Sequence, residues 1–143
     1  MGKKVWFRAF VERLLMAQFD TRELVVDVDG DVPFHDETAA CWVSIETRPA
    51  LAVRVWGIAA DGIRPTAAAL REVNDLNQRA GLAKVTLGAG RVVVEVRLPA
   101  DQVSARSLSR ACGHVVGMAD DVGVLFAGVF GGSTPFSAAV EAG

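Results

Sequence analysis

The chain opens with apolar residues spaced as on one face of a helix. From residue 4 to 19 they recur at i, i+3, i+4 and i+7, while most charged residues fall on the opposite side. The pattern predicts a helix over residues 4–19 that covers a core with a single face.

Later segments alternate apolar with polar residues, the period of a strand with one buried face. Five strands are predicted, over residues 23–34, 39–47 and 51–59 and in the two arms of a hairpin over 83–99. The first contains a turn or irregularity at Asp29-Gly30. The short connection around Arg48-Pro49 forces antiparallel pairing of the strands that it joins.

Two further helices are predicted from apolar periodicity and end signals. Thr66 is a candidate cap for a helix that Gly81 ends, and the last helix extends from residue 104 to about 130, where Gly131 and Gly132 stop it. The order helix, three strands, helix, two strands, helix predicts an α+β fold with one antiparallel sheet and helices packed on it. We expect a single domain over residues 1–132 and a loose C-terminal tail over 133–143.

The alternation also divides the strand residues between two faces of the sheet. One face is uniformly apolar and is predicted to form the core. The other mixes charges with apolar and aromatic residues, among them Trp42, Arg54, Trp56, Ile58 and Val93. A contiguous exposed aromatic patch usually marks a contact surface, so we expect these five residues to bind a partner protein or peptide. In the alternative, the two tryptophans pair across strands beneath a loop or a dimer partner.

The helix before Gly81 carries two asparagines near its apolar stripe. Asn77 projects between Leu70 and Val73 on the expected core side, and Asn74 lies at the border. A buried amide without a partner costs roughly 1–3 kcal/mol, so a partner is expected. The two amides are predicted to fix the turn into the next strand, and ligand contact is the alternative.

Length and composition set the class of protein. With 143 residues, 51% hydrophobic and 22% charged, the chain is expected to fold as one globular domain. With a formal net charge of −2 and scattered basic residues, the sequence predicts no positive surface that would attract nucleic acid. The basic start is interrupted by charges, and the uncharged run over residues 122–140 contains a Gly-Gly-Ser-Thr-Pro break, so no membrane segment is predicted. Cys41 and Cys112 are expected to be reduced core thiols of a cytoplasmic protein.

No motif assembles a catalytic or metal site. The Asp-Val-Asp-Gly-Asp run at residues 27–31 fails as a calcium loop, because Val32 and Thr38 stand where glycine and a carboxylate are needed. His35 and His114 have no metal-ligand spacing, and alternation places Cys41 in the core. The sequence therefore predicts a protein that is not an enzyme and has no catalytic residue, no metal and no cofactor.

Three stretches resemble a known family, the YbjN-like branch of the type III secretion chaperone-like fold. They are residues 70–87, with Asn74 and Asn77 in an N-x-x-N helix end, residues 91–108, with the Leu98-Pro99 pair, and residues 129–132, with the terminal glycine pair. The resemblance extends from the first helix to Gly132.

The resemblance implies a non-enzymatic chaperone or adaptor that binds a client peptide or protein and has a regulatory role in sensory transduction. It also implies a homodimer whose interface includes the asparagine helix and the hairpin. A small-ligand-sensing module, with a metabolite bound between the sheet and the helices, is the alternative function. The two differ in their sites, since a peptide needs a shallow groove or sheet edge and a metabolite needs a closed polar pocket.

Overall fold

The computed structural model of the protein describes residues 2–79 and 81–136. The elements in chain order are α1 (Gly2–Gln18), β1 (Val32–Phe34), β2 (Ala40–Glu46), β3 (Ala52–Ala60), α2 (Ala67–Arg79), β4 (Lys84–Gly88), β5 (Arg91–Pro99), a short 3-10 turn (Ala100–Gln102) and α3 (Ala105–Phe130). This order confirms the predicted α+β fold.

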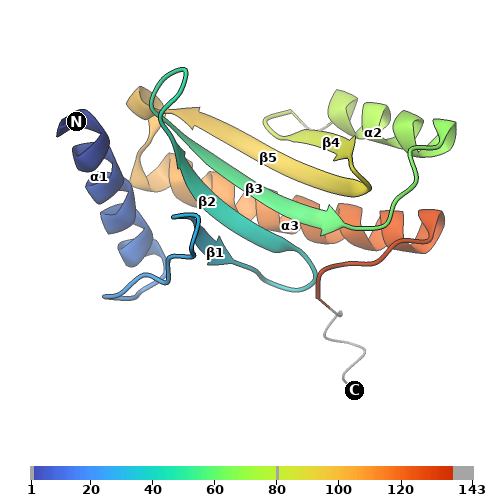
Figure 1. Cartoon of the computed structure of the whole chain (residues 1–143), viewed down its shortest axis with the longest axis horizontal. Helices are drawn as coiled ribbons and strands as arrows, with labels where there is room; N and C mark the ends of the chain where they lie inside the picture. The colour runs from blue at the N-terminus through green and yellow to red at the C-terminus, as the bar shows by residue number, and fades with distance from the viewer. Residues whose placement is uncertain (1, 80, 137–143) are drawn as a thin grey trace.

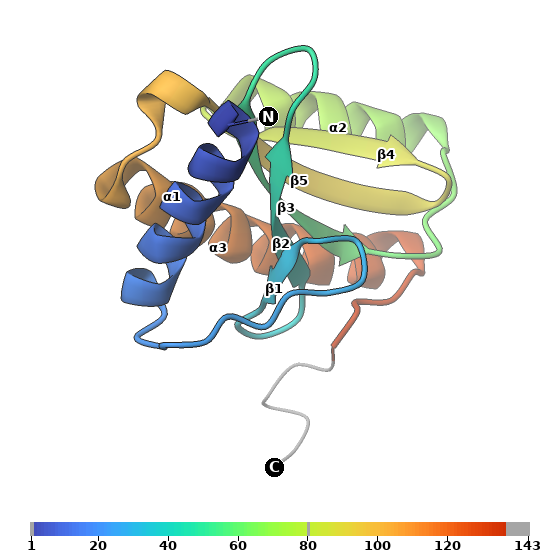
Figure 2. The same cartoon turned by 60° about the vertical axis from the view of Figure 1, so that its left-hand side comes forward.

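The strands form one antiparallel sheet in the order β1-β2-β3-β5-β4. Figure 1 shows α3 behind the strands, α1 at one end of the sheet and α2 alongside β4, and the turned view in Figure 2 shows the same arrangement from the side of α1. The opposite face of the central strands has no helix in front of it among the described residues.

The core lies between the sheet and the helices. It contains the apolar face that alternation predicted, with Val53, Val55, Val94 and Val96 almost fully buried. The stripe of α3 packs on these strands, because a side chain every three or four residues faces the sheet. Close approach of α3 to β3 depends on Gly123, since a Cβ there would collide with the carbonyl of Ala59.

Helix ends follow the predicted signals. Ala69 N–H donates to Thr66 Oγ1 at 3.1 Å at the start of α2, which confirms the Thr66 cap. Ser104 and Ser107 form a reciprocal capping box at the start of α3, and Gly131 closes its end in the left-handed conformation.

The first predicted strand is wrong over residues 23–31, which form a loop, and only β1 remains of it. Asp27 Oδ1 accepts the backbone N–H groups of Asp29 and Asp31, at 3.0 and 2.9 Å. An aspartate that holds nearby backbone amides competes with strand pairing. Val28, assigned by alternation to the core, is therefore fully exposed.

The segment after α3 also corrects a prediction. Residues 133–136, expected to be loose, are held to the body of the protein, because Ser133 and Asp61 exchange two backbone hydrogen bonds at 2.8 and 2.9 Å. The Phe136 N–H donates to the Thr38 carbonyl at 2.9 Å. The remaining residues of the predicted tail, 137–143, lie outside the described residues.

α3 is long and apolar enough, by length and composition alone, to cross a membrane. The structure gives its apolar stripe another role, because Leu108, Val115, Ala119 and Phe126 are buried against the sheet. Such a stripe is typical of the core helix of a globular domain.

Candidate functional site

Two tryptophans lie together on the face of the sheet that carries no helix. Trp42 of β2 and Trp56 of β3 are direct cross-strand partners, and their rings stack with centroids 4.6 Å apart and planes 24° from parallel. The indole N–H of Trp56 donates to Ser44 Oγ at 2.8 Å. Both side chains are half-buried, so the pair presents a flat aromatic surface whose orientation is fixed by stacking and a hydrogen bond.

A charged network borders the tryptophans. The Arg54 guanidinium lies 4.7 Å from the centre of the Trp56 ring, within cation–π range, and its Nε donates to the Glu95 carboxylate at 2.5 Å. Glu95 also lies 3.9 Å from Lys84 and 3.8 Å from Arg97. Burial raises the pKa of Glu95, but the hydrogen bond from Arg54 and the charges of the three basic neighbours outweigh this and lower it.

The five residues expected to form a contact surface differ in accessibility. Trp42, Arg54, Trp56 and Val93 are half-buried and lie on β2, β3 and β5 of the open face. Ile58 is 7% exposed, between its cross-strand neighbours Ala40 and Val93. Little of the Ile58 side chain is therefore accessible in this conformation, and its contact with a partner stays a prediction.

A cavity of about 290 Å³ adjoins the tryptophan pair. It is lined mainly by apolar and aromatic side chains, from Val25, Pro33, Phe34, His35, Ala40, Cys41, Trp42 and Phe136. The rings of His35 and Phe136 stack at 4.4 Å on its wall. Together, the pair and the cavity can accept an apolar or aromatic side chain beside an exposed aromatic platform.

Asp120 of α3 fixes the loop that carries this cavity, and sequence reasoning missed it. Its Oδ1 accepts the Thr38 N–H at 2.8 Å, the Thr38 hydroxyl at 3.0 Å and the Ala39 N–H at 2.8 Å. All three residues are buried. The available signal was a carboxylate directly after Ala119 of the buried stripe, because an acid at a buried helix position needs hydrogen-bond donors from elsewhere in the chain.

The asparagines of α2 lie away from this face. Asn77 Nδ2 donates to the Val85 carbonyl at 2.8 Å, and the Val85 N–H donates to Asn77 Oδ1 at 2.7 Å. The amide thus bonds across the turn to the backbone of β4, an edge strand. Asn77 as a whole is exposed, so its predicted place on the core side of α2 is wrong, and Asn74 is exposed as well.

The cysteines are poorly suited to nucleophilic chemistry. Burial raises the pKa of the Cys41 thiol to about 12, with a further contribution from the charge of Asp120. Burial likewise raises the pKa of Cys112, to about 11. The thiolate is the reactive form, so both are inert at neutral pH. Within residues 2–79 and 81–136, no three His, Cys, Asp or Glu side chains are grouped to hold a metal ion.

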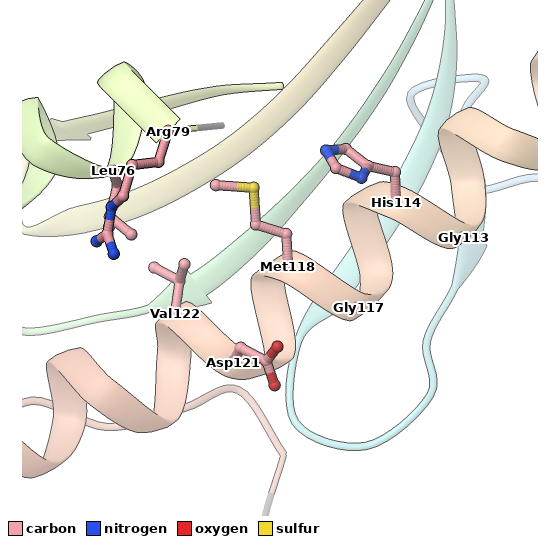
Figure 3. A pocket seen from close by; sticks show the side chains of 8 residues that line it. All are labelled: Leu76, Arg79, Gly113, His114, Gly117, Met118, Asp121 and Val122. Carbon is pink, nitrogen blue, oxygen red and sulfur yellow. The ribbon is translucent and has the colours of Figure 1, made fainter. Parts of the chain in front are cut away.

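A second cavity, of about 480 Å³, lies between α2 and α3 (Figure 3). Leu76, Met118 and Val122 give it an apolar part, and Arg79 and Asp121 stand near it on opposite helices. It is lined by helices, whereas the tryptophan pair and its cavity are formed by strands and loops.

Comparison with known proteins agrees with this architecture. No curated protein matches the chain. Solved structures that are similar in fold include that of the ExsC-ExsE complex, with a TM-score of 0.64 and 11% identity over 86% of this chain and 95% of the other. The HopA1-SchA chaperone-effector complex has a TM-score of 0.63 and 15% identity over 80% of this chain and 93% of the other. The Yersinia pestis type III secretion chaperone SycH, in complex with a fragment of YscM2, has a TM-score of 0.59 and 14% identity over 79% of this chain and 96% of the other. At these identities the likeness shows the fold alone.

The family is shown by sequence. The profile described as "T3SS (YopN, CesT) and YbjN peptide-binding chaperone 1" matches residues 6–138, from α1 through all five strands and α3. The protein therefore belongs to the family of type III secretion and YbjN peptide-binding chaperones.

Proposed function

We propose that the protein is a non-enzymatic chaperone or adaptor that binds an extended, apolar segment of a client protein on the open face of its sheet. The observation that carries this proposal is the stacked Trp42–Trp56 pair with the apolar cavity beside it. Aromatic side chains whose orientation is already fixed bury a large area at low entropic cost, which suits them to recognise a peptide.

The two edge strands of the sheet are poorly suited to pair with an added client strand, which favours binding of the client on the face of the sheet. At one edge the backbone of Val85 in β4 is already bonded to Asn77. At the other, β1 has three residues and includes Pro33, which has no N–H to donate. Short strands, proline and covered backbone groups are devices that prevent further strand pairing. The client is therefore proposed to contact side chains of the open face.

Family membership supports the chaperone class, and the solved relatives include a chaperone-effector complex. We further propose that the protein acts in the cytoplasm as a homodimer, needs no cofactor and binds no nucleic acid. A role in sensory transduction is a proposal that would follow from the identity of the client. A small-ligand sensor is the alternative: the cavity beside Trp42 has few polar groups, whereas Arg79, His114 and Asp121 line the cavity between α2 and α3.

The test compares Trp56→Ala with wild type for capture of clients from native lysate, with quantitative mass spectrometry. Peptides from each recovered protein are then titrated by calorimetry. Trp6→Ala is the matched control, since Trp6 is 66% exposed and also stacks on an aromatic ring, but lies on α1. Loss of peptide binding in Trp56→Ala alone is expected. Unchanged peptide binding would contradict the proposed face.

A further inference from the structure

The stretch of chain after α3, residues 133–136, lies against the cavity beside the tryptophan pair. In Figure 1 it leaves the end of α3 and reaches the loop between β1 and β2. Gly132 passes the end of β3 so closely that a Cβ there would collide with the Asp61 carbonyl. Ser133 then exchanges its two backbone hydrogen bonds with Asp61. The path of this C-terminal segment is therefore set by contacts with the end of β3.

The segment ends with an aromatic ring at the proposed client site. The Phe136 ring stacks on His35 at 4.4 Å and forms a wall of the cavity that Trp42 also lines. Its N–H donates to the Thr38 carbonyl at 2.9 Å. An aromatic side chain of this chain thus already lies where the proposed function places an apolar or aromatic side chain of a client.

The segment is held by few contacts. Among the described residues, three backbone hydrogen bonds tie it to the body of the protein, two to Asp61 and one to Thr38. Phe136 remains 40% exposed, so its ring buries only part of its surface. Segments with few buried apolar contacts open at a small fraction of the free energy of global unfolding. The segment can therefore leave while the rest of the fold persists.

The surface that receives the segment does not depend on it. Thr38 is fixed by its hydrogen bonds to Asp120 of α3, and His35 follows β1 directly. Departure of the segment would leave the backbone N–H and C=O of Asp61 and the buried Thr38 carbonyl without these partners. An unpaired buried polar group is costly, so the vacated surface favours another segment that supplies the same bonds.

We propose that the C-terminal segment is autoinhibitory: it occupies part of the client site, and a client segment with an aromatic side chain displaces it. The client ring then stacks on His35 beside Trp42, and the client backbone bonds to Thr38 and Asp61 in place of Phe136 and Ser133. A segment tethered to its own site competes at a high effective concentration, so only clients that carry the aromatic residue bind well. The inference rests on the proposed function and adds the class of client and the regulation of its site.

A peptide with the sequence of residues 131–143 tests the proposal, labelled with fluorescein at its N-terminus and titrated by fluorescence anisotropy. The full chain with Phe136→Ala is expected to bind it about tenfold more tightly than wild type, because the tethered competitor has lost its ring. A peptide that itself carries the Phe136→Ala change is expected not to bind. Adding Trp42→Ala to the Phe136→Ala protein is expected to abolish binding, since Trp42 lines the cavity.

Trp6→Ala is the matched control, because it removes an exposed aromatic ring on α1, and it is expected to bind the peptide as wild type does. Thermal melting followed by circular dichroism verifies that each variant is folded. Equal peptide binding by wild type and Phe136→Ala, or no binding by Phe136→Ala, overturns the inference. So does binding that the Trp42→Ala change leaves intact.

Client peptides recovered from lysate separate this inference from the proposed function. They are expected to bind Phe136→Ala more tightly than wild type. Equal or weaker binding to Phe136→Ala overturns displacement, and weaker binding would make Phe136 a permanent wall of the site. Either result leaves the open face standing as the client site, because only unchanged binding in Trp56→Ala contradicts that face.

Discussion

Removal of the Asp120 carboxylate should cost more stability than any other single polar change among the residues described. In Asp120→Ala, the Thr38 N–H, the Thr38 hydroxyl and the Ala39 N–H lose their common acceptor. Thr38 and Ala39 are 1% and 0% exposed, so water does not reach these groups without rearrangement of the loop. The three bonds join residues about eighty positions apart in the chain, and their loss also frees the loop on which Phe136 rests.

The magnitude follows from the number of donors. An unpaired buried donor costs roughly 1–3 kcal/mol, and the side chain vacates a space that water can partly fill. We therefore expect Asp120→Ala to lower the free energy of unfolding by about 3–5 kcal/mol. Asp120→Asn retains a carbonyl acceptor but loses the charge, so a loss of about 1–2 kcal/mol is expected.

Urea unfolding followed by circular dichroism and tryptophan fluorescence measures both values. Asp75→Ala is the control, because Asp75 is an exposed aspartate on α2 and its loss should change stability by less than about 0.5 kcal/mol. If Asp120→Ala unfolds within about 1 kcal/mol of wild type, the three hydrogen bonds do not hold the loop, and the reasoning is wrong.

Three other predictions concern the edge strand, the charged network and the thiols. Asn77→Leu should lower the free energy of unfolding by about 1–2 kcal/mol in urea, because the Val85 backbone loses two bonds, while client binding per folded molecule is unchanged. Folding lowers the pKa of Glu95, so the ionised carboxylate stabilises the fold at pH values above its ordinary pKa of 4.5, and this stabilisation is lost as pH falls through the pKa of the folded protein. Glu95→Gln should therefore make the urea midpoint less sensitive to acid. Cys41 and Cys112 should resist thiol reagents at neutral pH until denaturant is added, and rapid labelling of native protein would contradict their burial.

Local sequence patterns were sufficient to predict those helices and strands whose conformation is determined by their own residues. The helices, the hairpin and the pairing of β2 with β3 follow from periodicity, end signals and short turns, and the structure contains them all. The expected strand over residues 23–34 is wrong over residues 23–31, because Asp27 accepts two backbone N–H groups there although apolar and polar residues alternate. The alternation of apolar and polar residues does not reveal that a side chain will bond to the backbone N–H groups that a strand would need.

The sequence by itself determined the class of fold, the two faces of the sheet and the position of Trp42 and Trp56 on the same face. Each depends on the period of an element or on the length of a turn, which neighbouring residues set. Only the tertiary structure decided that Ile58 is covered, that Asp120 holds Thr38, that Asn77 bonds to Val85 and that residues 133–136 lie against the body. The residues that bury these positions, or hydrogen-bond to them, lie in distant segments of the chain or across a turn. Whether they come into contact depends on how the packed helices and strands are placed in space.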